Sequence, residues 1–129
     1  MSRVLVNTQN FMFANMIQQT LEKGDFNVTI AKNPQNVIGE FNRQASNIVI
    51  LEVTGYTPWK FEERMKLRQQ IKQIDSYCKI VVLVDEKTEP QVAAKVRQAM
   101  IDGLIDQFIY MSISASYLLG IMETLSGTI

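Results

Sequence analysis

One carboxylate, Glu52, stands directly after an unbroken run of four apolar residues, at positions 48–51. An apolar run of this length is typical of a strand that is buried on both faces, as in a parallel sheet. Asp and Glu are almost never fully buried without a partner. Ligands of α/β proteins bind in the crevice beyond the carboxyl ends of such strands. Glu52 is therefore the first candidate for a functional site.

The rest of the composition limits the chemistry available around Glu52. The chain has no histidine, the commonest general base and metal ligand, so triads built on histidine are excluded. The single cysteine, Cys78, cannot form an internal disulfide, and we expect an unreactive thiol in a cytoplasmic protein. Thirteen basic and thirteen acidic residues cancel, which gives no electrostatic reason to expect nucleic acid or an anionic membrane as partner.

Strand-like and helix-like segments alternate along the 129 residues, the length of one ordinary domain. The predicted strands cover residues 4–6, 26–30, 47–53, 79–84 and 106–110. Each is followed by apolar residues at helical spacing. Five strand–helix repeats predict an α/β fold, a doubly wound five-stranded parallel sheet of the flavodoxin-like (βα)5 type, with helices on both faces.

Apolar stripes predict which side chains of the helices face inward. The stripe of the third helix, predicted at about 59–74, is Leu67, Ile71 and Ile74. The stripe of the fourth helix is Val92, Val96, Ala99 and Met100. Thr88 and Gln91 have the spacing of a capping box at the start of the fourth helix.

Five residues after the central strand allow a structural and a functional interpretation. Lys60, Arg64 and Arg68 recur every four residues, and they predict a solvated helix face more readily than a docking site for an acidic partner. Tyr56 and Trp59, in and after a loop rich in turn residues, are either a binding anchor or packing over the strand ends.

The order of the elements, the carboxylate that ends the third strand and the run at 105–111 resemble the receiver domain of two-component response regulators. The resemblance covers the whole chain and rests on element order and spacing more than on motifs. It implies a doubly wound five-stranded sheet. In that family an aspartate at the end of the third strand accepts a phosphoryl group from a histidine kinase, and Glu52 holds the matching position.

The family's metal-binding positions are replaced in this chain. The acidic pair that normally holds Mg²⁺ after the first strand matches Asn7 and Thr8, or Thr8 and Gln9 if the register slips by one. Mg²⁺ requires hard oxygen ligands, usually one or two carboxylates. Glu52 and Asp85 are the only acids expected near these strand ends, so we predict no metal and no cofactor.

The other family positions are replaced as well. The hydroxyl residue that ends the fourth strand matches Val84, and the lysine that ends the fifth strand matches Met111. The proline after that lysine matches Ser112, whereas the aromatic switch residue is retained as Phe108. Phosphoryl transfer depends on cations that neutralise developing charge. The resemblance therefore predicts the fold of a receiver without its chemistry.

We expect a non-catalytic receiver-like domain that signals by binding a protein partner, independently of aspartyl phosphorylation. Residues 1–129 form one domain, either complete in itself or part of a longer signalling protein. One alternative is a receiver that is competent for phosphorylation. Another is a flavodoxin-like nucleotide binder, which needs a phosphate-binding loop after the first strand, although residues 7–10 contain no glycine.

Glu52 itself has two interpretations. It imitates a phosphorylated aspartate, or it is an inert relic that accepts a hydrogen bond from Asn7 or Thr8. We favour the relic because the residues that would respond to the charge are replaced. In either case some polar group must satisfy the carboxylate, since an unpaired buried charge is costly.

The resemblance also implies a partner surface, made of the fourth helix, the fifth strand and the fifth helix. The inward stripes leave Ile101 and Tyr117 at the edges of their helices. With Tyr110 they are predicted to form one exposed apolar and aromatic patch, which is typical of an interaction site. We expect a protein partner or a homodimer at this patch.

Overall fold

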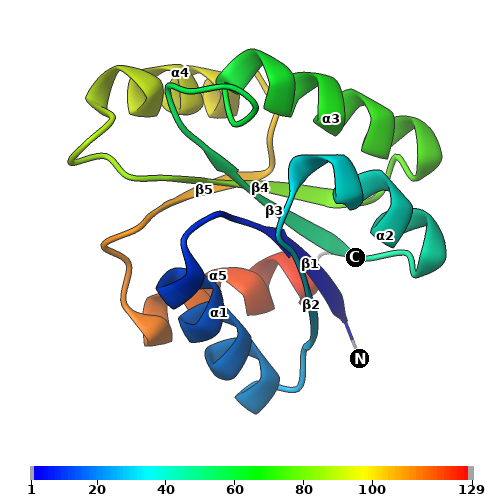
Figure 1. The fold of residues 1–129 in the computed structure, drawn as a ribbon. Helices are drawn as coiled ribbons and strands as arrows, with labels where there is room; N and C mark the ends of the chain where they lie inside the picture. Colours follow the sequence, from blue (N-terminus) through cyan, green and yellow to red (C-terminus); the bar gives the residue numbers. More distant parts are fainter. Residues whose placement is uncertain (1, 128–129) are drawn as a thin grey trace.

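One parallel sheet organises the chain, of which the computed structural model describes residues 2–127. The strands are β1 (Arg3–Asn7), β2 (Asn27–Ala31), β3 (Ile48–Val53), β4 (Lys79–Val84) and β5 (Gln107–Tyr110). All four pairings are parallel, and the strand order is β2-β1-β3-β4-β5 (Figure 1). The order reverses between β1 and β3, as in a doubly wound sheet, and this confirms the predicted fold class.

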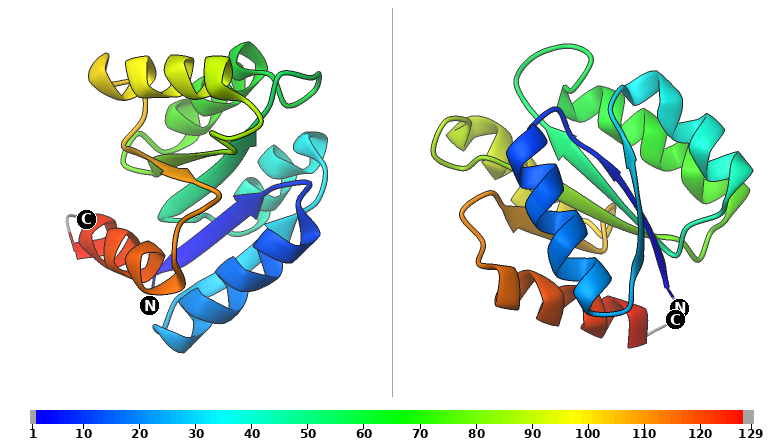
Figure 2. Two further views of the ribbon diagram at one scale, coloured as in Figure 1. Left: turned by 90° about the vertical axis from the view of Figure 1, so that its left-hand side faces the viewer. Right: turned by 60° about the horizontal axis from the view of Figure 1, so that its bottom comes forward.

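Helices cover both faces of the sheet. They are α1 (Phe11–Lys23), the short 3₁₀ helix η1 (Pro34–Asn36), α2 (Val37–Arg43), α3 (Phe61–Ile74), α4 (Pro90–Ile101) and α5 (Ala115–Gly127). α1 and α5 lie on one face, and α2, α3 and α4 lie on the other (Figures 1 and 2). None of the helices described here is long and apolar enough to cross a membrane.

β3 is buried along its whole length. Ile48 and Ile50 pack in the core under α1 and α5, whereas Val49, Leu51 and Val53 pack under α2, α3 and α4. Two buried faces explain the unbroken apolar run in the sequence. Because side chains alternate along a strand, Glu52 faces the same side as Ile50, the side of α1 and α5.

The inward face of α3 differs from the predicted stripe. Leu67 and Ile71 are buried as expected, but Ile74 is 48% exposed. Ile74 is the last residue of the helix, and the chain turns away at Asp75 towards β4. The stripe instead extends to the other end, because Arg64 lies three residues before Leu67 and is buried.

The start and the inward face of α4 also differ from the prediction. Ala93, Val96 and Ala99 are the buried residues, while Val92 and Met100 are only half-buried, so the face is rotated toward the small alanines. The predicted capping box between Thr88 and Gln91 does not form. α4 begins at Pro90 after Glu89, without a side-chain cap.

Cys78 is 1% exposed, and burial, with a smaller contribution from the charge of Asp75, raises the pKa of its thiol to about 12. We expect folded protein to resist an aromatic disulfide reagent at pH 8, because the thiolate fraction falls about a thousandfold relative to an ordinary cysteine. Absorbance of the released thiolate measures the reaction, with urea-unfolded protein as the fast control. Equal rates in both states would contradict the burial of Cys78.

Candidate functional site

The carboxylate of Glu52 is buried at the carboxyl ends of β1 and β3, with 4% exposure. One of its oxygens, Oε1, accepts a hydrogen bond of 2.6 Å from the Thr8 hydroxyl and one of 2.8 Å from the Gln9 backbone N–H. The Asn10 N–H in turn donates to Thr8 Oγ1 at 3.0 Å. The loop between β1 and α1 therefore wraps around the carboxylate. Thr8, one of the two partners predicted for Glu52, donates to it.

Asn7, the other predicted partner, is engaged elsewhere. Its side chain is fully buried, and Nδ2 donates to the Ala31 carbonyl oxygen at 2.7 Å. Its Oδ1 accepts a hydrogen bond from Nη2 of Arg64. Asn7 lies two residues after Leu5, on the side of α2 and α3, and Glu52 lies on the opposite side. Asn7 therefore connects β1 to α3.

Arg64 is the largest fully buried side chain of the described part of the chain, at 1% exposure. Its guanidinium lies over the Trp59 ring, 5.0 Å from the centroid, in a cation–π contact. Burial lowers the pKa of Arg64 to about 10, against the opposing effect of the negative charges of Glu52 and Glu63. A pKa near 10 leaves Arg64 a cation at neutral pH.

The prediction that this face of α3 is solvated is therefore wrong at Arg64. Lys60 is exposed, whereas Arg68 is half-buried and its Nε donates to the Leu104 carbonyl oxygen at 2.7 Å. The sequence carries a signal for the difference. Arg64 lies three residues before Leu67 and seven before Ile71, which places it on the buried face.

The two aromatic residues expected near the site lie in the loop between β3 and α3, and they differ in burial. Trp59 is buried, whereas Tyr56 is 74% exposed. The Thr54 N–H donates to the Trp59 carbonyl oxygen at 2.9 Å, and the Trp59 N–H donates to that of Tyr56 at 2.8 Å. These bonds turn the Trp59 ring inward beneath Arg64.

Each residue at the remaining family positions contacts a neighbouring residue of the chain. Val84 is buried and pairs with Val53 and Tyr110 in the sheet. The sulfur of Met111 lies 3.8 Å from Asn10 Nδ2, and the Ser112 hydroxyl donates to Glu86 Oε2 at 2.7 Å.

These residues do not fit a magnesium ion. Glu52 is the carboxylate that contacts Thr8, and the oxygen of Asn7 already accepts from a cation. Asp85 accepts backbone N–H groups of its own loop, including that of Lys87 at 3.1 Å. Within residues 2–127 no three acidic or cysteine side chains lie close enough to hold a metal ion. A nearby guanidinium also repels a second cation.

Known proteins resemble this chain in structure but not in sequence. No family model and no curated protein matches the sequence. A response regulator from Thermotoga maritima matches with a TM-score of 0.77 and 22% identity over 96% of each chain. The chain has the receiver fold. The Vibrio cholerae chemotaxis protein CheY4 matches with a TM-score of 0.77 and 18% identity, over 97% of this chain and 98% of CheY4. NtrX of Brucella abortus matches with a TM-score of 0.78 and 15% identity, and this chain spans only 27% of the length of NtrX.

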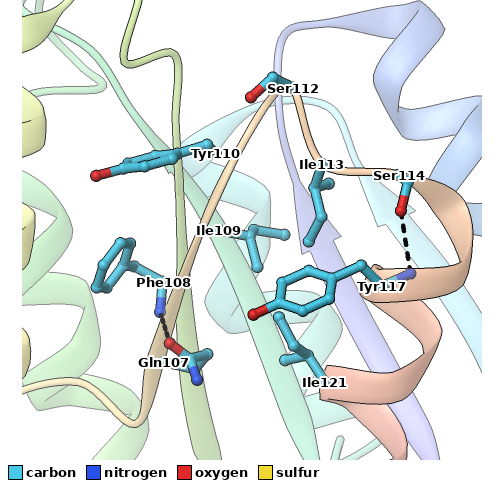
Figure 3. A pocket seen from close by; sticks show the side chains of 9 residues that line it. All are labelled: Gln107, Phe108, Ile109, Tyr110, Ser112, Ile113, Ser114, Tyr117 and Ile121. Atoms are coloured by element: carbon cyan, nitrogen blue, oxygen red, sulfur yellow. Dashed lines mark hydrogen bonds between the residues drawn. The ribbon is translucent and has the colours of Figure 1, made fainter.

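The edge strand β5 and helix α5 of the receiver fold border a groove of about 440 Å³ (Figure 3). Phe108 and Tyr110 lie on one side of β5, with ring centroids 5.5 Å apart, while Tyr117 lies on the other (Figure 3). The Tyr110 hydroxyl accepts a bond of 3.0 Å from Arg97 of α4, and Tyr117 is 65% exposed. Ile101 is 77% exposed at the end of α4 but does not line this groove.

Proposed function

We propose that this chain is a non-catalytic receiver-type domain that acts in signal transduction by binding a protein partner, without phosphorylation of Glu52. The observation that carries the proposal is the engagement of Glu52 Oε1 by the Thr8 hydroxyl and the Gln9 N–H. Solved structures of the same fold are named as response regulators and as a chemotaxis protein, which supports a role in signalling.

The proposal of inactivity rests on the donor set around Glu52. Phosphoryl transfer needs cations that neutralise the charge on the transferred group. A metal site is disfavoured at Asn7 and Thr8, and the position of the family's lysine holds the uncharged Met111. Arg64 is a cation, but it is held against Trp59 and Asn7.

Treatment with acetyl phosphate and MgCl₂ is therefore expected to leave the intact mass of the protein unchanged. Glu52→Asp supplies the family's acceptor and is also expected to stay unmodified, because Met111 and Thr8 remain. A receiver domain with a complete aspartate site, treated in parallel, gains one phosphoryl group and serves as the positive control. A phosphoryl adduct on Glu52 would show a phosphorylation-competent receiver instead.

The partner surface proposed for this domain is formed by α4, β5 and α5. Its support is the pair of tyrosines, Tyr110 and Tyr117, at the groove beside β5 (Figure 3). Tyrosine is enriched at interfaces because it offers a large apolar ring with a polar end. Without phosphorylation to regulate it, this surface is available continuously to a second copy or to an effector protein.

A further inference from the structure

Most buried polar side chains of the described chain gather at one place, the carboxyl ends of β1 and β3. They are Asn7, Thr8, Glu52, Thr54 and Arg64, while Ser46 lies before β3. Two of them, Glu52 and Arg64, are ionisable groups of opposite charge. Such groups are rarely buried without compensation, because removal of a charge from water is costly.

Glu52 and Arg64 reach this place from opposite faces of the sheet. In the described range 2–127 the two side chains form no direct ion pair. They are joined instead through two consecutive residues, Asn7 at the end of β1 and Thr8 directly after it, since Thr8 donates to Glu52 and Asn7 accepts from Arg64. Their charges also attract one another directly, because Glu52 opposes the loss of the Arg64 proton.

We propose that Arg64 is a built-in cation, which takes the electrostatic role of a bound metal ion at this end of the sheet and holds Glu52 and the loop from β3 to α3 in one arrangement. The inference rests on the proposed function, in which the site carries neither phosphoryl group nor metal. A side chain on α3 cannot dissociate as an ion does. The arrangement is therefore permanent and does not depend on the concentration of a metal.

The contacts of Arg64 show how such a cation is held. Nη2 donates to Asn7, and the guanidinium plane lies over Trp59. Arg64 Nε is buried without a hydrogen-bond partner among the described residues. The position of the guanidinium therefore depends on the hydrogen bond to Asn7 and on the contact with the Trp59 ring. Trp59 is the only tryptophan of the chain, and its emission reports directly on this contact.

A double-mutant cycle on the full chain tests the inference. Glu52→Gln, Arg64→Met and the double variant are unfolded in urea, and Lys66→Met replaces Arg64→Met in a control cycle. Lys66 is an exposed cation on the same helix. We expect the double variant at the site to have an unfolding constant more than about threefold smaller than the product of the two single effects predicts. In the control cycle we expect the two single effects to multiply. A coupling below threefold, or equal to that of the control, overturns the inference.

A second readout covers the case in which Arg64→Met does not fold. Arg64→Gln then replaces it in the cycle, because glutamine removes the charge but keeps an N–H donor for Asn7, and we expect the coupling to Glu52 to persist above that of the Lys66 control. The Trp59 emission of the unaltered protein is expected not to change with millimolar MgCl₂. A saturable change would show that a metal still binds and would overturn the inference.

The outcome is separable from that of the phosphorylation experiment. If the cycle shows no coupling and the mass is unchanged after acetyl phosphate, the inference of a built-in cation is wrong and the proposed function still stands. A phosphoryl adduct removes the proposed function, whatever the coupling.

Discussion

Replacement of Arg64 by alanine is expected to lower the free energy of unfolding by about 3–5 kcal/mol, the range for removal of one partner from a buried charge arrangement. The substitution leaves the Asn7 Oδ1 acceptor unpaired, removes the counter-charge of Glu52 and empties the space over the Trp59 ring. Urea unfolding followed by circular dichroism measures the loss.

Lys66→Ala provides the matched control, because Lys66 is exposed on the same helix and its substitution removes the same charge. We expect a change within about 0.5 kcal/mol, as for most surface substitutions. A loss at Arg64 no larger than that at Lys66 would mean that the guanidinium is in fact solvated, as the basic pattern of the sequence suggests.

The substitution Tyr117→Glu is expected to weaken self-association, or binding to an effector, by at least about thirtyfold, the effect of a central interface residue. Tyr117 is 65% exposed on α5 and lines the groove beside β5. A carboxylate there would be desolvated in any interface without a partner. Sedimentation of both proteins over a range of concentrations shows whether the average mass depends on Tyr117.

Tyr77→Glu is the control, since Tyr77 is 81% exposed but lies between α3 and β4, outside the groove. It should associate as the unaltered protein does. A monomer at every concentration, together with an effector whose binding is insensitive to Tyr117→Glu, would remove α4, β5 and α5 as the partner surface.

The receiver fold of this chain is held together by the apolar residues of its strands. β3 packs into both cores through its apolar residues, and only its end carries Glu52. Val84 is the last residue of β4, and Met111 directly follows β5. Burial of apolar surface dominates the stability of a domain, so site residues can change while the sheet is retained.

Several features were predictable from the sequence because they depend on local pattern. Two-sided burial requires the unbroken apolar runs of β3 and β4, and alternation with helical segments determines a parallel, doubly wound sheet. The position of Glu52 at the strand ends follows from its place in the run. Thr8 is one of the two partners that the sequence predicts for Glu52, since both candidates follow or end β1.

The surroundings of Arg64 were decided only by the tertiary structure. Helical spacing places Arg64 on the buried face of α3, but the same residue also fits a basic stripe with Lys60 and Arg68. A cation can be buried there only because Asn7 comes from β1 and Trp59 is turned inward by the loop after β3. These partners are distant in sequence or positioned by a loop, and local periodicity does not specify the hydrogen bonds and ring contacts that offset the burial of a charge.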